Sequence, residues 1–239
     1  MKRLTVDAAE RLAIKFRTEA QLSRTEPISL YGVLLNKGIL AVFKPMSVHA
    51  CGLSTMSRDK KNKYVLINSS RSLGRQRFTI AHELYHLYYD ENPEPHMCFD
   101  GNGTKSAKEA DADMFASALL MPYDGLIAGI PDVELRIGQI SLATVMRLEQ
   151  VYGVSHQAMC YRLKRLKLIT EAQLQELLAI SVARTAQSFG YSTRIYDDGD
   201  GRKEVVGDFI AKARLLLEAE KISEGHYQEL NNLIDDGEG

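Results

Sequence analysis

Three residues in one short run have the types and the spacing for metal-assisted hydrolysis. The run His82-Glu83-Leu84-Tyr85-His86 carries two histidines four positions apart. On a helix with 3.6 residues per turn, both imidazoles project from one face, about 6 Å apart along the axis, and both can reach one metal ion. The carboxylate of Glu83 then lies beside the metal, where it can hold a water and take its proton. We therefore expect His82 and His86 to be metal ligands and Glu83 to be the general base.

A catalytic zinc site usually has three protein ligands, so a further ligand must come from another part of the chain. Glu109 lies 23 residues after His86, across a segment long enough to reverse the chain direction, and Asp113 is four residues further on. Both carboxylates share one helix face, and the small side chains of Ala112 and Ala116 beside them would let two helices approach closely. We predict that Glu109 is the third ligand. We also predict that Asp113 accepts a hydrogen bond from the free ring nitrogen of one ligand histidine, which fixes the tautomer of that ring.

A five-residue match of this kind can also arise by chance on a helix that only packs. The pair of carboxylates at a workable distance strengthens the metal interpretation. Two histidines and one glutamate suit Zn²⁺, with Mn²⁺ or Fe²⁺ as alternatives.

The surrounding sequence predicts the elements that position these side chains. The 92–104 segment, rich in Pro, Gly and Asn, is expected to be a loop. Helices and strands are expected from apolar periodicity, N-cap residues and chain breakers. The expected helices cover 6–22, a short stretch after Ile28, 74–89, 106–120, 140–152, 155–168, 171–189 and two final stretches, the last with an N-cap at Ser223; the expected strands cover 38–43 and 64–68, with a two-strand piece over 191–206. Early strands with helices, followed by helices only, predict an α+β fold.

The composition is that of an ordinary globular protein. The chain has 239 residues, of which 45% are hydrophobic and 26% are charged, and its net charge is −1. The three cysteines are few and odd in number, so we expect no disulfide framework and a reducing, cytoplasmic location. The N-terminal stretch carries charges where a signal peptide would be apolar, and no run approaches the roughly 20 apolar residues of a membrane span. The charge balance also lacks the footprint of a nucleic-acid-binding protein.

Two blocks of this sequence resemble the ImmA/IrrE metallopeptidases. The first block, Arg77 to His86, reads RFTIAHELYH and is similar to the active-site helix of that family. The second block, Glu109 to Pro122, reads EADADMFASALLMP and is similar to its second helix. The resemblance extends over roughly residues 5–170.

The resemblance implies a zincin-like, specifically gluzincin-like, peptidase domain with a small β-sheet and the active site on the HExxH helix. It implies that His82, His86 and a glutamate bind the metal and that Glu83 is the general base. Matching the second block places the glutamate at Glu109. The family also implies a substrate, a helix-turn-helix transcriptional repressor whose cleavage derepresses phage, mobile-element or stress genes.

We expect three parts in the chain: a metallopeptidase core over 1–125, a helical extension resembling a helix-turn-helix over 126–170, and a mostly helical appendix over 171–239. The alternative to a peptidase is a regulatory module on a peptidase fold that binds a repressor or DNA without cutting.

Direct DNA binding would use the basic side chains near the end of the extension, Arg162, Lys164 and Arg165. Apolar residues such as Leu163 and Leu166 interleave with them, which favours a packed helix with one solvated face. We therefore expect a protein substrate as the partner and rank DNA below it.

A few further residues are candidates for supporting roles. Tyr123, His96 and Tyr64 could stabilise an oxyanion, and the strand region over 53–68 could pair with an extended substrate. Cys51 and Cys160 are expected to be packing residues. His96 and Cys98 lack a second such pair nearby, so we expect no structural zinc site there.

Overall fold

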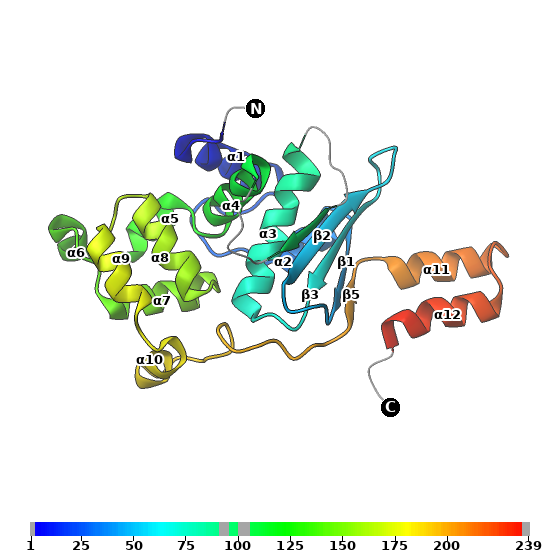
Figure 1. The fold of residues 1–239 in the computed structure, drawn as a ribbon. Coiled ribbons are helices and arrows are strands. Elements are labelled where there is room, and N and C mark those ends of the chain that lie inside the picture. The colour runs from blue at the N-terminus through cyan, green and yellow to red at the C-terminus, as the bar shows by residue number, and fades with distance from the viewer. Residues whose placement is uncertain (1–2, 91–95, 100–105, 236–239) are drawn as a thin grey trace.

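The computed structural model describes residues 3–90, 96–99 and 106–235 of the chain (Figure 1). The helices are α1 Val6–Glu19, α2 Leu30–Asn36, α3 Leu73–Tyr89, α4 Ala107–Leu120, α5 Tyr123–Gly129, α6 Asp132–Ile137, α7 Leu142–Tyr152, α8 His156–Arg165, α9 Glu171–Leu178, α10 Val182–Ser188, α11 Phe209–Glu218 and α12 Glu224–Asp235. The strands are β1 Ile39–Lys44, β2 Ala50–Met56, β3 Lys63–Asn68, β4 His96–Phe99 and β5 Glu204–Val206.

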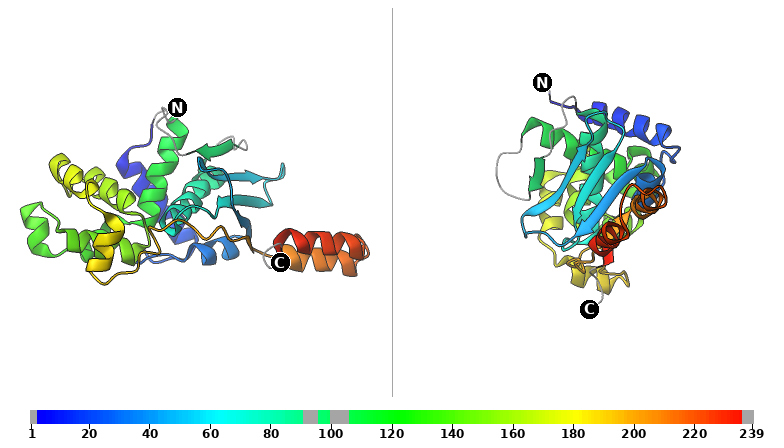
Figure 2. Two further views of the ribbon diagram at one scale, coloured as in Figure 1. Left: turned by 60° about the horizontal axis from the view of Figure 1, so that its bottom comes forward. Right: turned by 90° about the vertical axis from the view of Figure 1, so that its right-hand side faces the viewer.

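The five strands form one mixed sheet in the order β4-β2-β3-β1-β5. β1 and β3 are parallel, whereas β2 is antiparallel to both β3 and β4, and β5 is antiparallel to β1. Along β1 the buried residues alternate, and Ile39, Ala41 and Phe43 point into the core. α3 packs against the sheet, and α4 and α1 pack in turn behind α3 (Figure 2). The expected α+β fold is confirmed.

A single buried amide organises the turn that leads from β3 into α3. Asn68 ends β3, and its amide nitrogen donates to the carbonyls of Ser47 and Ala50 at 3.1 and 2.8 Å. Its amide oxygen accepts from the backbone N–H groups of Met46 and Ser70 at 3.0 and 3.1 Å. All four hydrogen-bonding positions of the amide are therefore used, which fixes the chain where the helix carrying the histidines begins.

Several local expectations differ from the structure because long-range pairing overrides local sequence signals. The expected loop over 92–104 contains β4, which pairs with β2, although the rest of that segment lies outside the described residues. The expected helix over 171–189 is two helices, α9 and α10, because the backbone at Ser181 is extended and starts a new helix. The expected two-strand piece over 191–206 contains only β5 in the structure.

The hypothesis that residues 53–68 accept an extended substrate by strand addition is wrong. β2 lies between β4 and β3, and β3 lies between β2 and β1, so their edges are already paired. Among the described strands, β4 and β5 are the outer ones of the sheet. The sequence did not predict the start of β2 before residue 53 or the short helices α5 and α6.

The chain after α4 forms a helical extension and then returns to the sheet. α7, α8 and α9 pack together, a connecting segment runs back past α3, and β5 pairs with β1. The α11–α12 hairpin extends away from the rest of the molecule (Figures 1 and 2). The division of the chain at 125 and 170 stays a prediction.

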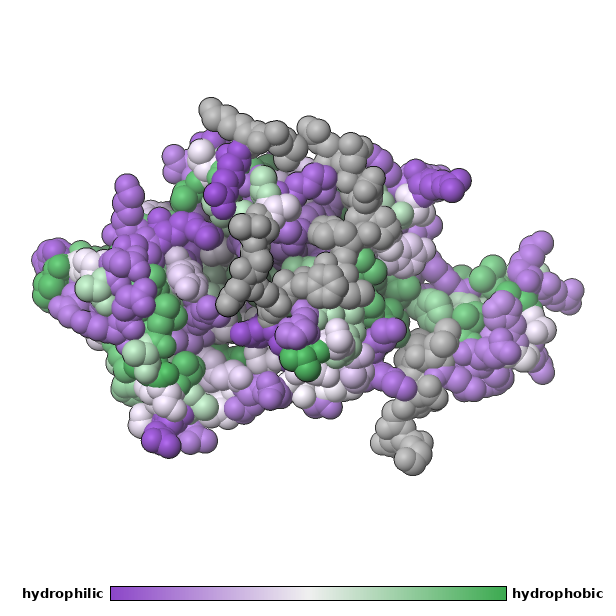
Figure 3. Space-filling view, viewed as in Figure 1, coloured by the Kyte–Doolittle hydropathy of each residue, from purple (hydrophilic) through white to green (hydrophobic). Residues whose placement is uncertain are grey.

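The surface seen in the space-filling view is largely hydrophilic, with apolar side chains over α6–α9 and on the α11–α12 hairpin (Figure 3). Exposed apolar residues there include Val133 and Ile137 on α6 and Leu215 and Leu216 on α11. None of the described helices combines the length and the apolar character that a bilayer crossing requires.

A buried ionic cluster holds the extension together. Glu149 on α7 is fully buried, and its carboxylate accepts hydrogen bonds from the imidazole of His156 at 2.7 Å and from the hydroxyl of Tyr196 at 2.8 Å. The second ring nitrogen of His156 lies 2.8 Å from the carbonyl of Leu177 on α9. Burial opposes the charged imidazole, but the interactions with Cys160 and Glu149 outweigh it and raise the pKa of His156 to about 10.

This cluster predicts a stability that declines at alkaline pH. Because the pKa of His156 is raised from 6.5 to about 10 on folding, its contribution is complete below about pH 6.5 and is lost as the pH rises through 10. We expect His156→Gln to lower the free energy of unfolding by roughly 3 kcal/mol near neutral pH. The difference from the unmodified protein should shrink towards pH 10. Urea unfolding across this pH range measures it, with the exposed His226→Gln as the control. A difference that stays constant with pH contradicts the ionic role.

Candidate metal centre

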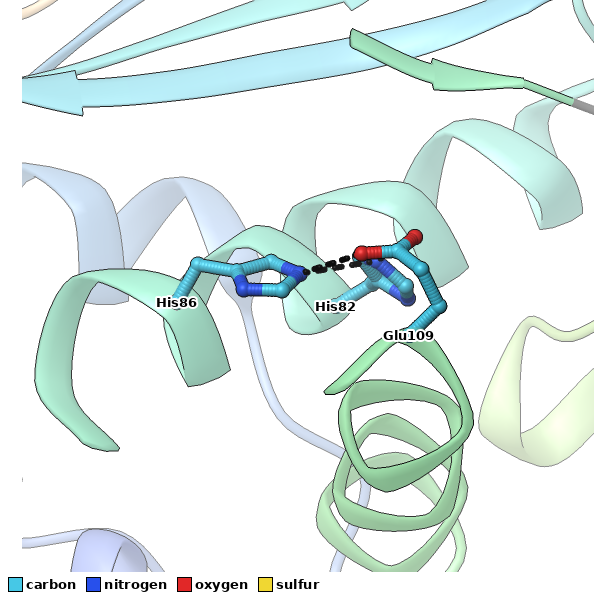
Figure 4. A group of neighbouring side chains, drawn as sticks. All are labelled: His82, His86 and Glu109. Carbon is cyan, nitrogen blue, oxygen red and sulfur yellow. Dashed lines mark hydrogen bonds and ion pairs between the residues drawn. The ribbon is translucent and has the colours of Figure 1, made fainter. Parts of the chain in front are cut away.

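Three side chains from two helices face one another (Figure 4). His82 and His86 lie on α3 and are 2% and 3% exposed, and Glu109 reaches them from the first turn of α4. The Nε2 atoms of the two histidines are 3.2 Å apart. One carboxylate oxygen of Glu109 lies 3.2 Å from His82 Nε2, and the other lies 3.2 Å from His86 Nε2.

These distances fit a single tetrahedral metal ion. With metal–ligand bonds of about 2.0–2.1 Å, neighbouring donors of a tetrahedral site lie about 3.3 Å from one another. The three donors already have nearly this separation. They also form one of the two described groups of His, Cys, Asp and Glu donors compact enough to hold an ion.

The carboxylate of Glu83 also fits a metal centre. Glu83 is 1% exposed, and neither of its oxygens has a hydrogen-bond partner in the described part of the chain. An unpaired buried carboxylate is costly, and a bound metal with its water would supply the partner that it lacks. The residues present therefore fit a divalent metal.

Each histidine has a carboxylate behind it that orients the ring. His82 Nδ1 lies 2.9 Å from the Asp113 carboxylate, on the same face of α4 as Glu109. His86 Nδ1 lies 3.4 Å from the carboxylate of Asp90, which also pairs with the Lys108 ammonium at 3.0 Å. Such contacts hold the outer ring nitrogen and leave Nε2 free for a metal. Asp90 is not among the site residues predicted from the sequence, although its position four residues after His86, one helical turn further on, was a signal.

Several carboxylates surround the site, and they favour the protonated, positively charged form of His82. Burial disfavours the charged ring, but the hydrogen bonds to Asp113 and Glu109 raise the pKa of His82 to about 10. Glu109 is three residues after the N-cap Ser106, whose side chain accepts a hydrogen bond from the Glu109 backbone N–H. The carboxylate therefore sits at the positive end of the α4 dipole, where a negative charge is favoured.

Neither Tyr64 nor Tyr123, two of the three oxyanion candidates, is placed at this site. Tyr64 is exposed, and its neighbours in β3, Val65 and Ile67, point to the α3 side of the sheet, so the tyrosine points to the other side. Tyr123 is exposed at the start of α5 and lines a separate cavity of about 530 Å³. The side chain of His96 lies outside the described residues.

The basic residues considered for DNA binding do not form a phosphate-binding surface. Arg162 is 2% exposed, pairs with Glu10 of α1, and donates to the carbonyl of Met121 at 3.0 Å. A side chain buried in this way cannot reach a phosphate, so its proposed DNA contact is wrong. Lys164 pairs with Glu171 at 3.2 Å, and of the three only Arg165 is exposed.

The geometry predicts different effects for the two carboxylates of α4. We expect Glu109→Ala to abolish tight metal binding because it removes one of three donors. We expect Asp113→Asn to weaken binding by roughly 10- to 100-fold, because it only loosens the orientation of His82. Competition with a chromophoric chelator measures both affinities, with the exposed Asp132→Asn as the control. Equal and undiminished affinity in both variants contradicts the assignment.

Comparison with known proteins agrees with this geometry. A family model described as the IrrE N-terminal-like domain matches residues 36–164, more than half of the chain, and the match includes both helices of the site. No curated protein matches the chain significantly. The expected relationship to the ImmA/IrrE metallopeptidases is thereby confirmed, and the chain belongs to the IrrE N-terminal-like family of metallopeptidases.

Proposed function

We propose that this peptidase is a zinc-dependent endopeptidase in which His82, His86 and Glu109 bind the metal and Glu83 is the general base. The observation that carries the proposal is the set of three donors 3.2 Å apart beside a buried carboxylate that lacks a partner. Mn²⁺ and Fe²⁺ accept the same ligands, so the choice of zinc rests on its preference for tetrahedral nitrogen and carboxylate sites.

The mechanism follows from the position of each side chain. A bound divalent metal polarises the scissile carbonyl and lowers the pKa of a water in the open position. Glu83 takes a proton from the attacking water and passes it to the leaving amine, since its carboxylate is buried and makes no competing hydrogen bond. Asp113 and Asp90 hold the imidazoles of His82 and His86 in the orientation that metal binding needs, while the charge at the site changes during the reaction.

The edge of the sheet offers a place for an extended substrate. β4 is an outer strand, and its Cys98 thiol lies within 4.8 Å of donor atoms of His82 and Glu83. A peptide that adds to this edge by backbone hydrogen bonds would pass close to the catalytic residues. The resemblance to ImmA/IrrE metallopeptidases supports a helix-turn-helix repressor as the protein that supplies this segment.

The direct test is cleavage of the repressor encoded next to this protein, with the products read by intact mass. We expect one discrete cut by the zinc-loaded protein and a loss of roughly 10²- to 10⁴-fold in rate for Glu83→Gln, because the general base is removed. Glu176→Gln, on the exposed face of α9, is the matched control.

The opposite result also has a clear meaning. If metal is bound and the repressor is retained but is cut by neither the reduced nor the oxidised protein, the endopeptidase proposal fails for this substrate, and a non-cleaving regulatory module is favoured. If Glu83→Gln cuts as fast as the unmodified protein, Glu83 is not the base.

A further inference from the structure

A third kind of metal ligand lies beside the proposed centre. Donor atoms of His82, Glu83 and Cys98 all lie within 4.8 Å of one another. This group shares only His82 with the set of His82, His86 and Glu109. The thiol therefore approaches from the side of Glu83, the side on which the attacking water has to be held.

Cys98 also has a second cysteine against it. In the pairing of β2 with β4, Ala50 opposes Phe99 and Gly52 opposes Cys98, so Cys51 is the extra residue of a β-bulge. Neighbouring residues of a regular strand point to opposite faces of the sheet, so Cys51 would point away from the face shared by Gly52 and Cys98. A bulge changes this direction, because it sets two residues, here Cys51 and Gly52, against one, here Cys98. The two thiols interact, which lowers the pKa of Cys51 and, together with burial and the nearby carboxylates of Glu109 and Glu83, raises the pKa of Cys98. Cys51 is buried, Cys98 is partly exposed, and both are free.

We propose that Cys98 is a redox-controlled ligand of the metal centre: as a thiolate it occupies the open coordination position, and when it is joined to Cys51 in a disulfide that position is free. This inference rests on the proposed metal centre of His82, His86 and Glu109. Under reducing conditions the thiolate would block the coordination position that catalysis needs, and the peptidase would be inactive.

Binding of the thiolate requires the Cys98 side chain to move towards the other metal ligands. A sulfur ligand at about 2.3 Å and a nitrogen ligand at about 2.05 Å lie about 3.6 Å apart around a tetrahedral ion. The Cys98 sulfur is within 4.8 Å of a donor atom of His82 but does not form one group of that size with His86 and Glu109, so its movement on the outer strand β4 is directed towards these two residues. A zinc site with four protein ligands is closed, whereas catalysis needs an open position.

The placement of the two cysteines also suits a disulfide. The bulge sets Cys51 and Gly52 together against Cys98, so the two cysteines are neighbours across the β2–β4 pairing. The side chains already touch, so bond formation needs little movement of the backbone.

The oxidation step balances with a hydroperoxide as the oxidant. One thiolate sulfur attacks the peroxide, the O–O bond breaks, the alcohol or water leaves, and a sulfenic acid results. The other thiolate attacks that sulfur, the S–S bond forms, and hydroxide leaves and takes up a proton. Two thiols and one hydroperoxide thus give one disulfide, one water and one alcohol, and the two electrons lost by sulfur reduce the peroxide.

Cobalt substitution tests the ligand. The reduced protein loaded with Co²⁺ should show a near-ultraviolet charge-transfer band from thiolate to cobalt together with visible ligand-field bands. We expect Cys98→Ser to lose the charge-transfer band and to bind the metal roughly tenfold more weakly. Cys51→Ser and Cys160→Ala should keep the band, since Cys160 is buried on α8 against His156. A reduced protein without the band, or a band unchanged in Cys98→Ser, overturns the proposal.

Peroxide treatment tests the release. One equivalent of hydrogen peroxide should remove the charge-transfer band, leave the ligand-field bands, and yield a Cys51–Cys98 disulfide on peptide mapping without reductant. In Cys51→Ser no such disulfide can form. If the oxidised protein keeps the thiolate band, or if Cys98 is oxidised without joining Cys51, the redox control is wrong.

The same spectra separate this inference from the proposed function. Ligand-field bands without a charge-transfer band reject Cys98 as a ligand and leave the centre of two histidines and Glu109 standing. The absence of both sets of bands rejects the metal centre itself.

Discussion

The function depends on how closely α4 approaches α3. The two histidines are fixed relative to each other by one helical turn, but the third donor belongs to a separate helix. Ala112 and Ala116 on α4 are both fully buried, and larger side chains there would disturb the packing that holds Glu109 against the imidazoles. Phe115 of α4 packs against Tyr85 of α3, with ring centroids 5.8 Å apart, and this contact also helps to set the distance between the two helices.

Negative charge is concentrated at this contact. Glu83, Glu109, Asp113 and Asp90 surround two imidazoles, and Lys108 pairs with Asp90. Buried charges of one sign are expensive unless a counter-ion compensates them. A divalent cation offsets this cost, so the same arrangement that selects the metal also couples metal binding to the stability of the α3–α4 packing.

Local periodicity and chain breakers were enough to predict the helices of the site and the face shared by Glu109 and Asp113. The resemblance of two sequence blocks predicted the family. Features that depend on partners distant in the sequence were not predictable. The 92–104 segment has the composition of a loop, yet four of its residues are a strand because β2 offers them an edge. The bulge at Cys51 exists only in that pairing. From the sequence, Arg162 looks like an ordinary charged surface residue. Only the packing of α8 against α1 and α4 shows that it is buried.

The most direct measurement of the central claim is a crystal structure of the zinc-loaded protein with anomalous data at the zinc edge. The account predicts one strong peak bounded by His82, His86 and Glu109, with the Glu83 carboxylate beside the remaining position. A peak elsewhere, or none at saturating zinc, would contradict it.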